Sequence, residues 1–170
     1  LIVVAIIGIL AGVGIPMYNG YIEKAKVNAS QANLDNLSSY LQAEVYKCEL
    51  GEEYTFLMPG ISPWYKCSWN KGQKASNIAG TYLAKLIKNN YKNPHNTSKP
   101  ALNFGGGTCP NDQVAGEIYA DRLVTPNGDA VLLVSKLSND AGACPKGKWD
   151  QNGLQITESK NWAFKIIYMP

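Results

Sequence analysis

The 170-residue chain has few of the residues from which catalytic and metal sites are built. It contains one histidine, His95, and no cysteine lies near it at the spacing of metal ligands. The three glycines at 105–107 lack the lysine and the serine or threonine that follow in a phosphate-binding loop. His95 lies in a turn-like Asn-Pro-His-Asn stretch, where we expect a solvated turn residue. We therefore predict that the protein is not an enzyme and that it holds no metal or cofactor.

Charge is also scarce, and the sequence distributes it unevenly. The formal net charge is +3, which is too weak a bias to indicate nucleic acid or an anionic membrane as the main partner. Leu1 to Met17 contains no charged residue, so all 16 basic and 13 acidic residues lie after this run. The chain therefore begins with a segment unlike the rest.

The four cysteines, Cys48, Cys67, Cys109 and Cys144, are widely spaced. None forms the close pair of a zinc knuckle or a redox motif. An even number at these spacings indicates disulfides, and hence an oxidising compartment such as the periplasm or the cell exterior. Several pairings are possible; we favour Cys48–Cys67 and Cys109–Cys144, because each closes one contiguous segment. The alternative is four buried free thiols in a cytosolic protein.

The first 17 residues are apolar on every side of a helix. Such a helix has to be buried in protein or in lipid. About 17 helical residues cover roughly 25 Å, slightly less than the ~30 Å hydrocarbon core of a bilayer. A secretory signal peptide would begin with Met and a basic region and would end at a small-residue cleavage site, and the run shows neither feature. We expect a membrane or packing segment rather than a signal peptide.

Helical periodicity continues past the apolar run, now on one side only. Good helix formers dominate from Glu23 to Lys47, and we predict one helix from Leu1 to about Lys47, with residues 48–170 forming a globular head. We expect residues 1–17 to be the apolar part and residues 18–47 the amphipathic part. Pro16 should kink or locally open the helix. The predicted apolar stripe consists of Ile22, Ala25, Ala29, Ala32, Leu34, Leu37, Leu41 and Val45.

The run LIVVAIIGILAGVGIP, followed by MYNGYIEKAKVNAS, closely resembles the N-terminal helix of type IV pilins and the related type II secretion pseudopilins. Gly8 and Pro16 match the family's Gly and Pro in spacing. The resemblance implies that a prepilin peptidase cuts before this helix and that the helix first anchors the subunit in the inner membrane. It also implies that the pilus assembly machinery adds the subunit to a helical homopolymer. The implied filament-core residues are Leu1, Ile2, Val3, Val4, Ile6, Ile7, Gly8, Ile9, Leu10, Val13, Ile15 and Pro16.

The beginning of the chain departs from the family pattern. Mature pilins usually begin with a segment like Phe-Thr-Leu-Ile-Glu-Leu, whereas this chain starts where the pattern is already inside the helix. We expect further residues before Leu1 in the mature protein, which an intact-mass measurement would test. No residue here is assigned the acidic or the N-methylated role of the family.

The remaining sequence predicts an α+β head, so the predicted fold is a long N-terminal helix packed on an antiparallel sheet, as in pilins. We expect loops over Cys48 to about Gly80 and over Asn89–Pro110, a short helix near residues 78–87, a hairpin of 117–124 with 130–135, and a second hairpin of 153–157 with 161–168.

An aromatic and basic segment, residues 64–74, is the strongest surface candidate. Its aromatic rings could stack on bases or sugars while its cations pair with phosphate. The alternative, which we favour, is that the aromatics cover the core beside a Cys48–Cys67 bridge and the lysines only solubilise the surface. The residues concerned are Trp64, Tyr65, Lys66, Trp69, Lys71 and Lys74.

Three stretches match the Asn-x-Ser/Thr glycosylation pattern, at Asn28, Asn36 and Asn96. The first two fall in the predicted long helix, where they would be poor acceptors. The resemblance implies a prokaryotic source, in which this pattern is seldom sufficient. From the sequence we interpret all three as coincidental.

These observations together predict the major pilin of an extracellular filament at the cell surface, with an inner-membrane pool before assembly. Burial of the apolar helix against equivalent helices would drive polymerisation, and contacts that do not close on themselves would give a fibre. Adhesion, motility or DNA uptake are the implied roles. The alternatives are a type II secretion pseudopilin and a membrane-anchored module that binds nucleic acid or a glycan through residues 64–74.

Overall fold

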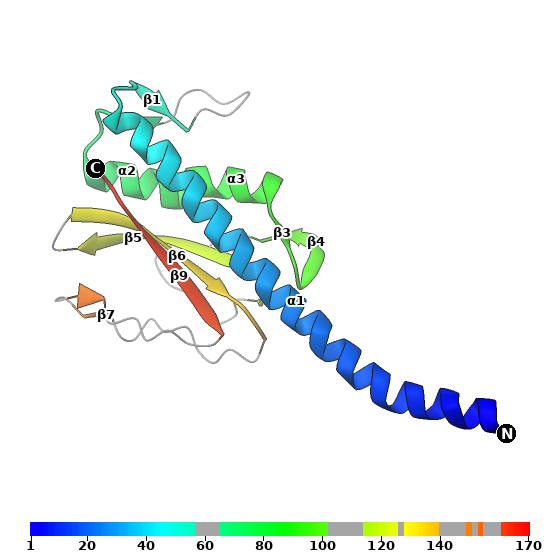
Figure 1. Cartoon of the computed structure of the whole chain (residues 1–170). Coiled ribbons are helices and arrows are strands. Elements are labelled where there is room, and N and C mark those ends of the chain that lie inside the picture. The colour runs from blue at the N-terminus through cyan, green and yellow to red at the C-terminus, as the bar shows by residue number, and fades with distance from the viewer. Residues whose placement is uncertain (57–64, 102–113, 126–127, 140–148, 151–152, 155–160) are drawn as a thin grey trace.

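One long helix and a small antiparallel sheet organise a mixed α+β molecule (Figure 1). The computed structural model describes residues 1–56, 65–101, 114–125, 128–139, 149–150, 153–154 and 161–170. Helix α1 spans Ile2–Glu49, and half of it projects beyond the head (Figure 1). The predicted fold class, a long apolar N-terminal helix on an antiparallel α+β head, is confirmed.

Helix α1 packs on the head through a narrow face of its C-terminal half. Leu34, Leu37 and Leu41 have no exposed surface and Val45 is 5% exposed, so one residue per turn enters the core. The buried face begins only at Ser30, whose Oγ donates to the carbonyl oxygen of Lys26 (2.9 Å). The predicted stripe is therefore wrong in its first half, where Ile22, Ala25, Ala29 and Ala32 are exposed. Ile22 and Ala25 precede the part of α1 that the head covers, whereas Ala29 and Ala32 lie off the buried face.

The central sheet has three strands in the order β5-β6-β9, all antiparallel. Strands β5 (Ile118–Thr125) and β6 (Gly128–Lys136) form the hairpin predicted from the sequence, with Thr125 paired to Gly128. Gly128 has φ +117°, a conformation that favours glycine at this turn. Strand β9 (Trp162–Tyr168) pairs with β6 along its whole length. The predicted hairpin of 153–157 with 161–168 is wrong for residues 153–154, because they pair with residues 149–150 and not with β9; residues 155–157 lie outside the described residues.

The two faces of this sheet carry separate groups of buried residues. Val131, Leu133 and Ile167 face the helices and join the core with α1. Leu132, Val134 and Trp162 form a second cluster on the opposite face. This alternation follows from the period of two in a strand. An exposed ion pair, Lys165 to Asp35 (2.9 Å), links β9 to α1 at the rim of the core.

A second helical layer crosses α1 over the same sheet (Figure 1). It runs without interruption through α2 (Lys71–Asn77), the π-helical turn η1 (Ile78–Tyr82) and α3 (Leu83–Asn90). The helix predicted near residues 78–87 is confirmed, but the expected loop up to Gly80 is wrong from Lys71 onward. Asn70 starts α2 with a capping box to Gln73, and this local signal identifies the true beginning.

Three two-stranded sheets complete the described residues. They are β1 (Tyr54–Thr55) with β2 (Tyr65–Lys66), β3 (Lys92–Asn93) with β4 (Asn96–Pro100), and β7 (Trp149–Asp150) with β8 (Gly153–Leu154). The hairpin β3–β4 lies in a segment for which we expected a surface loop. That expectation is wrong for residues 92–100, and the rest of the expected loop, residues 102–110, lies outside the described residues.

Candidate functional site: an exposed apolar helix

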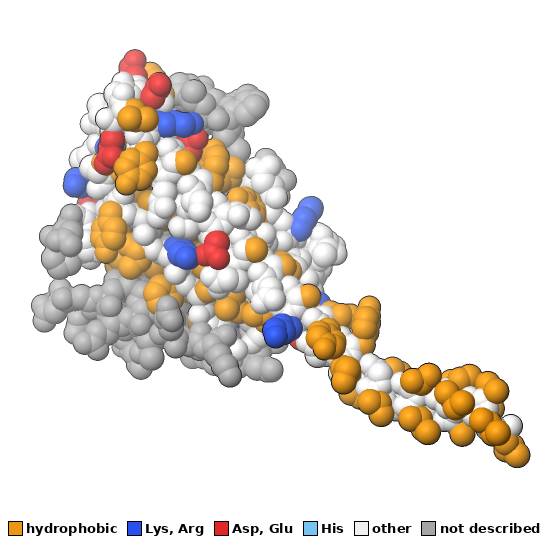
Figure 2. Space-filling model, viewed as in Figure 1, with side chains coloured by type: hydrophobic (Ala, Val, Ile, Leu, Met, Phe, Trp, Pro, Cys, Tyr) orange, Lys and Arg blue, Asp and Glu red, His pale blue; other side chains and the backbone are white. Residues whose placement is uncertain are grey.

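The first 22 residues, here called the stalk, are exposed along their whole length and carry no charge. Figure 2 shows the stalk as a continuous apolar rod that projects from a head of mixed polarity. Between Leu1 and Met17, eleven large apolar side chains are each at least 50% exposed. A folded chain keeps scattered apolar residues on its surface, but an all-apolar rod of this size marks an interaction site.

The free energy stored in this exposure is large. Burying one such side chain fully is worth about 1.5–3 kcal/mol, and these side chains are half exposed or more. The stalk therefore offers roughly 10–20 kcal/mol of apolar burial, before the entropy cost of association. By length and composition α1 is able to cross a membrane. A signal sequence near the N-terminus would meet the same criteria. Removal of the stalk from water is therefore strongly favoured.

Small residues mark one part of the stalk surface. Gly8 and Gly12 stand four residues apart, and a Cβ built on either would meet nothing within 4 Å. Small residues at this spacing allow the backbones of two apolar helices to approach closely. Gly14 is equally open. Larger side chains at these positions would disturb only a contact made outside this chain.

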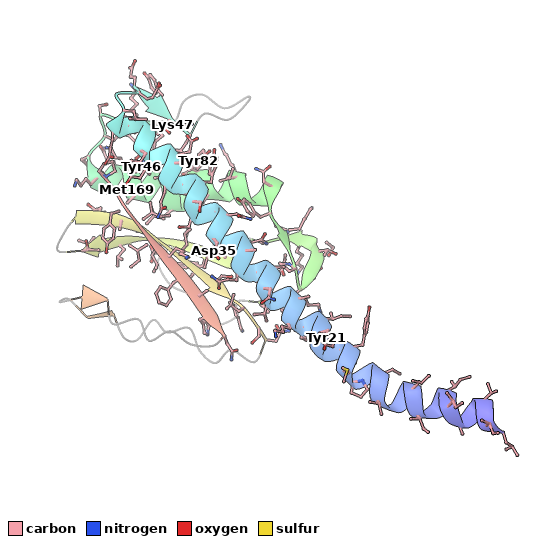
Figure 3. All side chains as sticks on the ribbon, viewed as in Figure 1. Tyr21, Asp35, Tyr46, Lys47, Tyr82 and Met169 are labelled. Carbon is pink, nitrogen blue, oxygen red and sulfur yellow. A yellow bond between two sulfur atoms is a disulfide. The ribbon has the colours of Figure 1, made fainter. Side chains whose placement is uncertain are left out.

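Pro16 lies within α1 without ending it. The axis of α1 bends in the projecting part, on the N-terminal side of Tyr21, but the helix continues on both sides (Figures 1 and 3). Proline removes one backbone donor and crowds the preceding turn, and bending is the usual response. The predicted kink is thus present as a bend, and the local opening that we considered does not occur.

The first charged residues follow directly after the stalk and meet the head. Glu23 pairs with Lys26 (3.1 Å), and His95 Nδ1 lies 3.9 Å from the Glu23 carboxylate. The His95 side chain is 5% exposed, and its Nε2 has no hydrogen-bond partner among the described residues. The prediction of a solvated turn histidine is therefore wrong. The turn that carries His95 packs against Gly116 and α1, and this packing removes the ring from water.

The aromatic and basic segment divides between the core and the surface. Tyr65 is 3% exposed and makes an edge contact with Phe56 (4.9 Å between ring centroids). Burial raises its pKa well above the usual range. Trp69 packs on Tyr65 at 5.9 Å, so these two rings complete the core beside the disulfide, as the favoured alternative proposes. Trp64 lies outside the described residues.

The lysines of the segment also differ in their exposure to solvent. Lys66 and Lys71 are exposed, whereas Lys74 is 6% exposed and its Nζ donates to the carbonyl oxygen of Pro170 (3.5 Å). Burial lowers the pKa of Lys74, and the nearby Lys71 lowers it further. The expectation of a surface cation at this position is wrong, because α2 turns Lys74 toward the end of β9. Lys66 and Lys71 are therefore the exposed lysines of this segment.

A disulfide ties the head to the end of α1. Cys48 and Cys67 are bonded, which confirms one of the two favoured pairings; Cys109 and Cys144 lie outside the described residues. Glu44, one turn before Cys48, is 7% exposed. Its carboxylate accepts hydrogen bonds from Thr55 Oγ1 (2.7 Å) and the Phe56 backbone N–H (2.8 Å). We call this arrangement the Glu44 clamp.

The electrostatics of the clamp follow from these contacts. Burial raises the pKa of Glu44, but the hydrogen bonds from Lys47, Thr55 and Phe56 together lower it by more, so the net pKa lies below the usual value. Lys47, the third donor, ion-pairs with Glu44 one turn along α1. The clamp was not predicted from the sequence. The available signal was an acidic residue inside the apolar face, directly before Val45.

Other chemistry is sparse in the described part of the chain. No three His, Cys, Asp or Glu side chains converge there on a possible metal position. A groove of about 320 Å³ lies between the end of α1 and β9, with Tyr46, Glu49 and Tyr168 on its walls.

The fold and the stalk together define a class: an α+β head carried on a long helix whose free half is apolar on all sides. Comparisons with protein-family models, with curated proteins and with solved structures find no match for this chain.

Proposed function

We propose that this protein is the structural subunit of an extracellular filament of the type IV pilin kind, held together by its stalk. The observation that supports the proposal best is the stalk itself, which carries eleven exposed apolar side chains on a rigid helix. A helix that is apolar on all sides is covered on every side only by lipid or by several neighbouring helices. Copies of the same helix provide such neighbours in a polymer.

The geometry of the head is consistent with this role. The head packs on α1 only beyond the stalk, so it leaves the full circumference of the first 22 residues available. Contacts between the stalk of one subunit and a different surface of the next generate a helical fibre when the rotation between subunits does not close a ring. The disulfide fits a head that works outside the cytoplasm. Adhesion, motility and DNA uptake are roles that such a fibre would serve.

A second function rests on the same stalk. The helix is long and apolar enough to anchor the head in a bilayer, and the protein would then act as a membrane-bound binding module or as a secretion pseudopilin. In the filament proposal the membrane is a stage before assembly. In this second proposal it is the final position of the stalk.

The two proposals separate when helix packing is changed without changing apolar character. Gly8→Leu and Gly12→Leu keep the stalk apolar, and a side chain at either position meets no part of the subunit itself. We expect both variants to fold and to enter membranes, but to form few fibres because close helix approach is lost. The matched control is Ile7→Leu, which alters a side chain of the stalk that is already large.

The measurement is electron microscopy of material sheared from the surface of producing cells, with antibody labelling of the head. Fibres that contain the wild-type and Ile7→Leu proteins, with sparse fibres for the glycine variants, support the filament. Wild-type protein that stays in the membrane fraction and never enters fibres overturns it in favour of the anchored module. Absence of labelled fibres from the sheared material, together with labelled fibres in the periplasm in sections of the same cells, would indicate the pseudopilin.

A further inference from the structure

The three Asn-x-Ser stretches stand in different surroundings in the folded protein. Asn28 and Asn36 lie in α1, where residues two positions apart point to different sides of the helix. Their partner hydroxyls are also used or covered: Ser30 is 1% exposed and donates to the carbonyl oxygen of Lys26, and Ser38 is 5% exposed. Neither stretch presents its amide and its hydroxyl together.

Asn96 differs in both respects. It opens strand β4, and residues 96–99 are all exposed. Residues two positions apart in a strand lie on the same side, so Asn96 and Ser98 face one another. The Ser98 hydroxyl donates to Asn96 Oδ1 at 2.6 Å, and the Ser98 backbone N–H approaches the same oxygen at 3.3 Å.

These contacts fix the orientation of the Asn96 amide. A backbone N–H is only a donor, so the atom that it contacts has to be the amide oxygen. Nδ2 therefore points away from Ser98, and none of the described residues hydrogen-bonds to it. A donor on Oδ1 draws electron density away from the nitrogen, which makes the amide N–H more acidic. The Asn96 side chain is thus on an exposed residue, with its amide polarised through Oδ1.

The hairpin holds this arrangement in place. Asn93 is 1% exposed, and its Oδ1 accepts from the backbone N–H groups of His95 (2.8 Å) and Asn96 (3.3 Å). Its Nδ2 donates to the carbonyl oxygen of Ala115 (3.0 Å). The buried Asn93 side chain thus holds the backbone on which Asn96 lies. The β3–β4 hairpin lies at the side of the head next to α1 (Figure 1). The site is ordered on its inner side and open on its outer side.

We propose that Asn96 is the acceptor of an N-linked oligosaccharide, delivered by a transferase from a lipid-pyrophosphate-linked donor. In this step Nδ2 gives a proton to a base of the transferase and forms a bond to the anomeric carbon of the sugar. The bond from that carbon to the pyrophosphate oxygen breaks, and its electron pair leaves with the lipid pyrophosphate. Nothing is oxidised or reduced. The structure thereby revises the interpretation of coincidence for Asn96 alone.

The test is peptide mass spectrometry of the protein purified from its native source. Chymotrypsin cutting after Tyr91 and Phe104 releases residues 92–104, which contain Asn96 but neither Asn28 nor Asn36. We expect this peptide to carry the added mass of one or more sugar residues on Asn96. The same peptide recovered without any added mass overturns the proposal, whether or not the protein forms filaments.

Variants then test the geometry. Asn96→Gln removes the acceptor, and Ser98→Ala keeps the asparagine while it removes the hydroxyl; both should reduce the modified peptide to background. Ser98→Thr keeps a hydroxyl and should remain modified, as should the control Asn36→Gln. Both Asn96 and Ser98 are exposed, so the head should fold in each variant. Full modification of Ser98→Ala would show that the hydrogen bond to Oδ1 has no part in acceptor recognition.

Discussion

Removal of the Glu44 carboxylate should loosen the end of α1 from the loop that follows it. The carboxylate is nearly buried and accepts from Thr55 Oγ1 and the Phe56 N–H. In Glu44→Ala the Phe56 N–H loses its acceptor, whereas Thr55 Oγ1 keeps the Glu44 backbone carbonyl oxygen (2.7 Å). A buried donor without a partner costs about 1–3 kcal/mol, and a lost hydrogen bond to a charged group about 1.5–3 kcal/mol.

We therefore expect Glu44→Ala to lower the free energy of unfolding by about 3 kcal/mol, since the two terms overlap in part. Glu44→Gln keeps an amide oxygen that can accept from Phe56 and Thr55, and it should cost only about 1 kcal/mol. For a domain of this size the alanine variant should melt roughly 6–12 °C lower. The difference between the two variants separates hydrogen bonding from charge.

The clamp also predicts how stability depends on pH. The pKa of Glu44 in the folded protein lies below its ordinary value of 4.5, because the hydrogen bonds outweigh the effect of burial. The unfolded chain therefore takes up a proton first as pH falls. The contribution of Glu44 is complete above the ordinary value and is lost as pH falls through the lower folded value. Glu44→Gln should remove this part of the acid sensitivity.

The assay is urea denaturation of the detergent-solubilised full chain, followed by near-ultraviolet circular dichroism between about pH 3 and pH 7. Thr55→Val provides the control, because it removes one donor and keeps the charge. A Glu44→Ala variant whose free energy of unfolding lies within about 0.5 kcal/mol of the wild type would contradict the proposed role of the carboxylate. A Glu44→Gln variant that keeps the full pH dependence of stability would contradict it as well.

Two further predictions concern other fixed points of the head. The Cys48–Cys67 bond joins residues 19 positions apart, and its reduction should lower the free energy of unfolding by about 2–4 kcal/mol. A double variant, Cys48→Ser with Cys67→Ser, that melts at the same temperature as the oxidised protein would contradict this. Gly116→Ala should destabilise the head by more than about 1 kcal/mol, because φ is +82° and the new Cβ would stand 2.1 Å from Asn93 Oδ1. A Cβ at Gly8 meets nothing within 4 Å, so Gly8→Ala should leave the denaturation midpoint unchanged. Equal midpoints for Gly116→Ala and Gly8→Ala would contradict the expected strain at Gly116.

The sequence predicted those parts of the fold whose signals are local. The apolar run and the leucines of α1 specify a long helix, and the stretch around Gly128 specifies a hairpin, because both depend on residues close in the chain. Cys48 and Cys67 were paired correctly for a related reason, since the segment between them is short. The candidate site, the stalk, could be predicted because its composition alone sets its environment.

Long-range pairing could not be predicted in the same way. Strand β9 pairs with β6 across a separation that no local pattern encodes. Lys74 and His95 were expected in solvent, because their own neighbours in the chain are polar, but packing of α2 and of the β3–β4 hairpin covers them. Which faces of α1 are exposed likewise depends on how far the head extends, and helical periodicity does not specify that distance.

The continuity of α1 determines how a pulling force would travel through the subunit. Tension on the stalk passes along one hydrogen-bonded helix and enters the head at Leu34, Leu37 and Leu41, which are packed in a row against the sheet side of the core. The load then acts as shear parallel to the helix axis, so these contacts resist together and do not open one at a time. Such a subunit should withstand stretching far better than sideways peeling of its helix.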